Sequence, residues 1–268
     1  MAIIMRINII KIAPISINKL KIITIIIHFI FSYTYELIGF IGPSITLLSL
    51  LLLFNKYHFL KILGLKWKIK HLFLFIFTML SVFLVLFLSI ININYYNVVY
   101  EINTSIFIYI IGQTLAEEIV LGFFLVNKLE SINNFNIKFL SIILLAIFFA
   151  ILHQIFYTNP IRHVSECLSG FSLLGLFIFG FIRIVGYLIF FNISFSWAIH
   201  LGWNTLFLPL FFIDNNGINL SEPSKFNLIF SQKTIILNLT SVFVVIFLIY
   251  YYYNYKILNQ KIDLKFST

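Results

Sequence analysis

The sequence predicts an all-α polytopic membrane bundle of about eight transmembrane helices, and three features carry that prediction. Of the 268 residues, 61% are hydrophobic and only 10% are charged, whereas soluble domains are about 45–50% apolar and 25% charged. The mean hydropathy is +1.05, and apolar blocks of transmembrane length recur along the chain. This composition excludes a soluble enzyme and a disordered chain. The single cysteine, Cys167, excludes a disulfide scaffold and a cysteine-rich zinc site.

The apolar blocks give the expected helices in chain order. Residues 22–54 are too long for one span and are interrupted by the polar stretch 33–36 and by Gly42–Pro43. We therefore predict two passes there, at about 20–38 and 40–55. Each later block approaches or reaches the roughly 20 residues that cross a bilayer. These later blocks lie at about 71–93, 104–126, 138–157, 168–190, 194–213 and 234–253.

Charged loops predict the orientation of the chain in the membrane. The net charge of +9 would suggest a nucleic-acid partner in a soluble protein, but cationic cytoplasmic loops explain it here. The basic segments 1–21 and 56–70 both belong in the cytoplasm, which requires an even number of passes between them. Alternation then places both termini in the cytoplasm of a bacterial cell, and it places four acidic residues outside: Glu101, Glu166, Asp214 and Glu222.

Ionisable residues within the predicted spans are candidates for function. A charge at the centre of a membrane helix costs about 2.5–3.5 kcal/mol on insertion scales, so such residues are rare unless they have a role. We assign His28 and Glu36, in the first predicted hairpin, a structural role near the interface. The remaining candidates are Glu117, Glu118, His153, Arg183 and His200.

Glu117 and Glu118 are adjacent in the middle of the predicted helix 104–126. Neighbouring helix positions point about 100° apart, so one carboxylate can face a cavity while the other faces a neighbouring helix. Gln113 lies one turn before Glu117, and Thr114 lies one turn before Glu118. A carboxylate in a cavity can act as a general base. The alternatives are a pair of satisfied buried polar groups or a proton relay.

Two other helices carry histidines in short motifs. Phe149 and His153 are four residues apart and share a helix face. Ser196, His200 and Asn204 form a polar stripe at the same spacing on a later helix. Donors one turn apart can hold a developing oxyanion, and the alternative is hydrogen bonding between helices.

Together, a Glu pair, Phe-x-x-x-His and His-x-x-x-Asn on three helices resemble the CPBP, or Abi, family of intramembrane proteases, which includes the CAAX prenyl endopeptidases. The resemblance covers about residues 100–210. We therefore divide the chain into a cytoplasmic segment, a first group of helices with a basic loop, a CPBP-like catalytic core, and a last loop, helix and tail. These parts span residues 1–21, 22–99, 100–213 and 214–268.

The resemblance implies hydrolysis of a peptide bond by an activated water, without a cofactor. Glu117 would activate the water and His153 would orient it. His200 and Asn204 would stabilise the oxyanion, while Glu118 would support the helix geometry. The same residues permit an alternative with zinc bound by Glu117, His153 and His200. The expected partners are the lipid bilayer and a membrane-embedded or lipidated peptide substrate, and no nucleic acid is expected.

One position departs from the family pattern Glu-Glu-x-x-x-Arg, because Gly122 stands where the arginine would fall. We hypothesise that Arg183 supplies the missing counter-charge to Glu118, with Phe149 as a second supporting residue. The alternative for Arg183 is an extended side chain that reaches the cytoplasmic interface. Gly122 also raises a non-catalytic relative, such as a bacteriocin-immunity or scaffold protein. A small transporter that uses the Glu pair is a third possibility.

Overall fold

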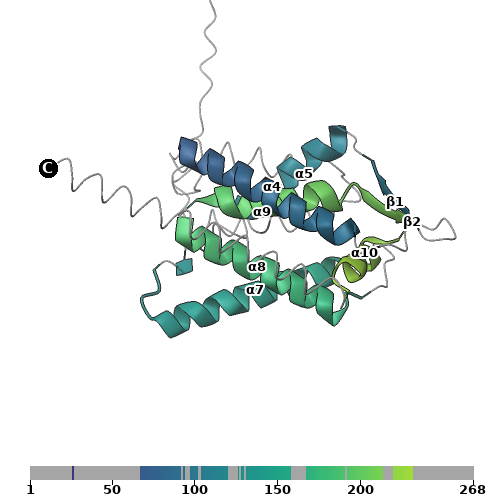
Figure 1. Cartoon of the computed structure of the whole chain (residues 1–268). Helices are drawn as coiled ribbons and strands as arrows, with labels where there is room; N and C mark the ends of the chain where they lie inside the picture. Colours follow the sequence, from purple (N-terminus) through teal and green to yellow (C-terminus); the bar gives the residue numbers. More distant parts are fainter. Residues whose placement is uncertain are drawn as a thin grey trace, which may run out of the picture.

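Six helices and two short strands make up the part of the chain that the computed structural model describes (Figure 1). The described residues are 26, 67–91, 93, 97–101, 104–119, 126, 128–129, 131–157, 167–190, 192–213 and 220–231. The elements are α4 (Ile69–Ile91), β1 (Asn97–Tyr100), α5 (Thr104–Glu117), α7 (Phe135–Tyr157), α8 (Gly170–Phe190), α9 (Ile193–Phe207), β2 (Leu210–Ile213) and α10 (Glu222–Ile229).

Three of these helices are long and apolar enough to cross a membrane: α4, α8 and residues Phe135–Ile155 of α7. Large apolar side chains cover the outer faces of α4 and α7, including Phe77, Leu80, Leu144 and Ile151, all at least 50% exposed. Such faces need an apolar solvent, so the helices fit a multi-pass membrane protein. Apart from Ile26, the predicted passes at 20–38, 40–55 and 234–253 lie outside the described residues, and the count of eight helices is not confirmed.

The described residues are mostly helical, as the sequence predicts, but they also form a small antiparallel sheet. We predicted one helix over 194–213, but α9 ends at Phe207 and residues Leu210–Ile213 form β2. Pro209 explains the break: Leu208 still has helical backbone angles and donates to the Asn204 carbonyl, but proline has no N–H with which to make the next helical hydrogen bond. β2 pairs with β1, Asn97 opposite Ile213 and Tyr100 opposite Leu210.

The short helix α10 was also missed, because it lies in the stretch 214–233 that we predicted as a loop. Ser221 caps its start by accepting a hydrogen bond from the backbone N–H of Ser224, and Pro223 stands in its first turn. Both are ordinary signals for the start of a helix. The helix has too few residues to be seen as an apolar block.

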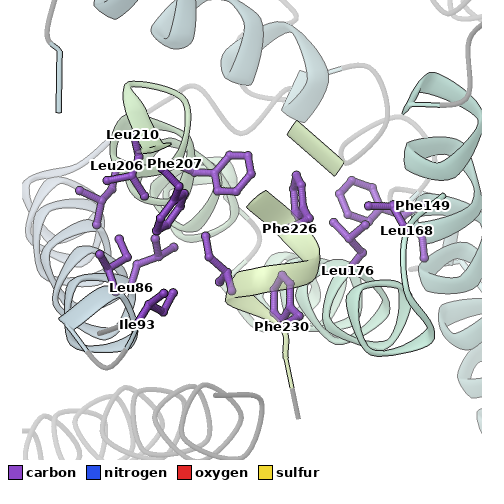
Figure 2. Packing of buried hydrophobic residues seen from close by; sticks show 14 residues of the cluster. Leu86, Ile93, Phe149, Leu168, Leu176, Leu206, Phe207, Leu210, Phe226 and Phe230 are labelled. Carbon is purple, nitrogen blue, oxygen red and sulfur yellow. The ribbon is translucent and has the colours of Figure 1, made fainter. Parts of the chain in front are cut away.

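The helix α9 lies at the centre of the bundle and packs on α4, α5 and α8, while α7 packs on the other side of α8 (Figure 1). Asn192 caps its start, its side chain accepting from the Ser194 N–H at 2.8 Å. A cluster of buried side chains joins α9 to α4, α7, α8 and α10 (Figure 2); it includes Leu86, Phe149, Leu176, Phe207 and Phe226. The central position of α9 brings its polar stripe next to three neighbouring helices.

The sheet and α10 close one end of the bundle. The Glu101 N–H donates to the Pro209 carbonyl at 3.1 Å, and Asn227 of α10 accepts from the Ser169 N–H at 2.7 Å just before α8. Tyr100 donates from its hydroxyl to the Thr205 carbonyl at 2.8 Å. Partial burial raises the pKa of the Tyr100 phenol, which keeps it a donor. This end collects the segments that we expect outside the cell.

Candidate active site

Glu118 is the buried anchor of the site. Its side chain is only 1% exposed, and it lies directly after the last residue of α5, facing α8 and α9. Arg183 of α8 donates from Nη2 to Glu118 Oε1, and the Ser196 hydroxyl of α9 donates to Oε2. His200 Nδ1 donates to Oε1 at 3.1 Å, since an ionised carboxylate can only accept. Three helices therefore meet at one carboxylate, with the cation and the hydrogen bonds that burial of a charge requires.

Glu117 has a different environment from its neighbour. Its side chain is 14% exposed and is not engaged by Arg183 through any described hydrogen bond. Gln113, one turn earlier on α5, donates to Glu117 Oε1 at 3.0 Å. His200 Nε2 lies 3.5 Å from Glu117 Oε2. The imidazole of His200 therefore lies between the two carboxylates, with one ring nitrogen toward each.

The backbone of α5 widens into a π-helical turn at Glu118 and Ile119. Such turns are rare and are frequent at functional sites. A second contact holds α5 against α9 one turn earlier, where the Trp197 indole N–H donates to the Thr114 hydroxyl at 3.0 Å. Thr114 itself donates to the Ile110 carbonyl at 2.8 Å. The position of the glutamate pair is thus fixed by tertiary contacts on two successive turns.

Aromatic rings surround the polar groups. The Arg183 guanidinium lies over the rings of Phe149 and Phe179, at 4.9 and 5.4 Å from their centroids. The Phe149 and His153 ring centroids are 4.3 Å apart, and the His153 Nδ1 donates to the Phe149 carbonyl at 2.9 Å. With the Nδ1 proton held by this carbonyl, a neutral His153 presents an acceptor at Nε2. Phe149 therefore contacts both the His153 ring and the Arg183 guanidinium.

The structure brings together four of the predicted residues: Glu117, Glu118, Arg183 and His200. His153 is linked to them through Phe149, on α7. Asn204 lies one turn beyond His200 on α9 and is half-buried, and within the described residues its side chain makes no hydrogen bond. Three other residues that the sequence singled out lie outside the described residues: Gly122, His28 and Glu36.

Two contacts of the site were not predicted. Ser196 belonged to the expected polar stripe on α9, but its bond to the Glu118 carboxylate was not foreseen. The spacing of four residues from Ser196 to His200 was the available signal, because it places both side chains on one face. The pairing of Trp197 with Thr114 had no such signal, since nothing in the sequence relates two positions 83 residues apart.

The zinc set is not assembled in this structure. Among the described residues, no three histidine, cysteine, aspartate or glutamate side chains gather closely enough to hold a metal ion. Glu117 and His200 are neighbours, but a zinc site needs at least three protein ligands around one ion. Glu117, His153 and His200 therefore do not fit a zinc centre as they stand.

Comparison with known families identifies the segment that contains this site. A family model described as Type II CAAX prenyl endopeptidase Rce1-like matches residues 99–206. The match covers the last two residues of β1, all of α5, α7 and α8, and all but the last residue of α9. It confirms the resemblance that we placed at about residues 100–210. No curated protein and no solved structure matches the chain.

Proposed function

We propose that the protein is an intramembrane endopeptidase, because a family model of Rce1-like type II CAAX prenyl endopeptidases matches residues 99–206. One observation supports this most. Glu117 is partly exposed beside His200, while Glu118 is fully buried and held by three donors. A reactive carboxylate needs access to water, and a structural one needs none.

In the proposed reaction, Glu117 takes a proton from a water molecule as that water attacks the carbonyl carbon of the peptide. His153 accepts a hydrogen bond at Nε2 and orients the water. The carbonyl π electrons move to the oxygen, and the resulting oxyanion is stabilised by the Asn204 amide and by the Nε2–H of a doubly protonated His200, whose Nδ1–H is donated to Glu118. The proton on Glu117 then passes to the amide nitrogen. The C–N bond breaks and releases an amine and a carboxylic acid.

Glu118 and Arg183 have positioning roles in this proposal. Glu118 accepts a hydrogen bond from the Nδ1–H of His200, which fixes the orientation of the imidazole relative to Glu117. Arg183 neutralises Glu118 in place of the arginine that the family pattern would put at position 122. Without a cation, the buried Glu118 carboxylate would be costly, and the imidazole would lose its fixed partner.

The substrate class follows from the location of the site. Glu117 and His200 lie among helices with lipid-facing apolar surfaces, so a substrate with an apolar or lipidated segment reaches them most readily. We propose that both termini of the protein are cytoplasmic and that catalysis needs no metal ion.

The test compares the wild type with Glu117→Gln and His153→Ala, each reconstituted in lipid vesicles. Cleavage is measured by mass spectrometry on a membrane-peptide mixture, and new termini made by the wild type are counted. We expect both variants to lose about 100- to 10,000-fold in rate, the usual contribution of acid–base residues. Glu101→Gln, an exposed carboxylate at the closed end of the bundle, is the matched control and should cleave like the wild type. Undiminished cleavage by both site variants would end the catalytic proposal.

A non-catalytic relative, such as an immunity or scaffold protein, is the second candidate because of Gly122. It predicts that the wild type produces no new termini in the same assay. It also predicts that any cellular phenotype survives Glu117→Gln, because the fold and not the chemistry would carry the function.

A further inference from the structure

Gln113 is a polar residue of the site that the proposed reaction does not use. It lies one turn before Glu117 on α5, and its Nε2 donates to Glu117 Oε1 at 3.0 Å. Residues four apart on a helix share a face, so Gln113 accompanies Glu117 to the partly exposed side of the site. Both residues are half-buried. The amide of Gln113 is therefore in direct contact with the carboxylate that we propose as the general base.

The two oxygens of Glu117 have different surroundings. Oε1 accepts the hydrogen bond from Gln113, whose length is within the usual range of about 2.7–3.2 Å. Oε2 lies 3.5 Å from His200 Nε2, which is longer than an ordinary hydrogen bond. In the proposed reaction, His200 donates that Nε2–H to the oxyanion, so its contact with Oε2 is lost when the tetrahedral intermediate forms. Oε1 still accepts from the Gln113 amide, and Oε2 is the oxygen that takes the proton of the water.

The contact with Gln113 matters because little else orients Glu117. The terminal torsion of a glutamate side chain is broad and twofold, so its two oxygens exchange places unless one of them is held. Glu118 is held by three donors from the neighbouring helices α8 and α9. Glu117 is the last residue of α5, directly before the π-helical turn. Within the described residues, the Gln113 amide makes the one hydrogen bond of ordinary length to the Glu117 carboxylate.

We propose that Gln113 is a positioning residue: its amide holds Oε1 of Glu117 and leaves Oε2 directed at the attacking water. This inference rests on the proposed endopeptidase function and names the group that orients its base. Gln113 itself exchanges no proton. Oε2 receives one proton from the water and passes it to the nitrogen of the peptide bond that breaks. The alternative is a contact that only stabilises α5, as polar pairs at this spacing do. The two roles differ in their effect on the chemical step.

The first test separates the chemical step from substrate binding. The probe is one peptide that the wild type cleaves in the vesicle assay described above, and kcat and KM are measured for Gln113→Met. This variant keeps an unbranched side chain of similar length but has no donor. We expect kcat to fall about 10- to 100-fold, because a misdirected base slows proton transfer. KM should change by less than about twofold, because binding of the peptide is not affected.

The matched control is Gln154→Met. Gln154 of α7 is also half-buried, and its Oε1 accepts from the Leu168 N–H at 2.9 Å. The same chemical change there removes a hydrogen bond of similar length without touching Glu117. The control should therefore keep kcat within about twofold of the wild type. An unchanged kcat in Gln113→Met, or equal losses of kcat in the two variants, would overturn the proposal.

The second test determines whether Gln113 acts through Glu117. Gln113→Met is introduced into the Glu117→Gln protein, and the residual cleavage of the same peptide is measured. A positioning residue has nothing to orient once the carboxylate is absent, so the residual rate should change by less than about twofold. A loss by the same factor in both backgrounds contradicts the assignment, because a residue that only supports the fold would have that effect. If Gln113→Met does not fold, Gln113→Ala replaces it in both tests, since alanine is the most favourable residue in a helix.

Failure of this inference is distinguishable from failure of the proposed function. Wild-type cleavage that is lost in Glu117→Gln but unchanged when Gln113 is replaced refutes the role of Gln113 and leaves the protease. Absence of any wild-type cleavage refutes the protease, and the role of Gln113 with it.

Discussion

Arg183 on α8 is ion-paired with Glu118, the residue that follows α5, although the two residues are 65 positions apart in the sequence. Both side chains are almost completely buried, at 6% and 1% exposure. The family pattern would place a cation four residues after the glutamate on the same helix, where this chain has Gly122. In this protein, the counter-charge instead comes from a neighbouring helix, and it ties α8 to α5 as well as neutralising the carboxylate.

Removing one partner of this ion pair should destabilise the protein more than removing both. Arg183→Met leaves an uncompensated buried carboxylate, and we expect a loss of about 3–5 kcal/mol in the free energy of unfolding. Adding Glu118→Gln removes the charge, so the double variant should regain part of that loss. Unfolding by detergent titration of the four proteins gives the coupling energy. Additive effects of the two changes would mean that the ion pair contributes little.

Replacing a glycine where α8 and α9 approach closely should also destabilise the fold. A Cβ on Gly186 would collide with the Phe195 ring, which is buried and packs on Phe190 with centroids 5.0 Å apart. We expect Gly186→Ala to cost about 1–3 kcal/mol, as overpacking does. Gly112 on α5 has open space at its Cβ, so Gly112→Ala should be neutral or stabilise by up to about 1 kcal/mol. Thermal unfolding of both variants distinguishes the two effects, and equal shifts would contradict the close packing.

Hydrophobic patterning was enough to predict most of the helices. The predicted blocks 71–93, 138–157 and 168–190 lie within three residues of α4, α7 and α8 at each end. Long apolar runs have no alternative in a bilayer, because only a helix satisfies every backbone group internally. The sheet could not be predicted in this way. Its strands have four residues each, and their pairing depends on a tertiary contact between distant segments.

The site was partly predictable for a different reason. Charges are so costly in hydrocarbon that the few buried ones stand out, which singled out Glu117, Glu118, Arg183 and His200. What the sequence could not give is the division of roles within the glutamate pair. Which of the two carboxylates is fully buried depends on how α5 is rotated about its axis against α8 and α9. Many packing contacts together set that rotation.

The orientation of the chain can be checked with its single cysteine. Cys167 is exposed and lies at the closed end of the bundle, where its carbonyl accepts from Asn227 Nδ2 at 3.2 Å. We expect it outside the cell, so a membrane-impermeant maleimide should label it in intact cells. Ser131 is exposed at the other end of α7, and Ser131→Cys in a Cys167→Ser background should react only after the cells are opened. The opposite labelling pattern would invert the proposed topology.

Metal chelation tests the zinc alternative directly. Because the described residues do not gather three ligands around one point, we expect the purified protein to keep full activity after dialysis against a strong chelator. Added zinc should not raise the rate, and it could lower the rate by binding between Glu117 and His200, which lie 3.5 Å apart. The controls are metal content, measured by mass spectrometry on the same samples, and a zinc endopeptidase treated in parallel. Zinc bound at one ion per chain, with activity that falls when it is removed and returns when it is restored, would replace the glutamate mechanism with a metal-dependent one. In that case Glu117, His153 and His200 would have to move together when the ion binds.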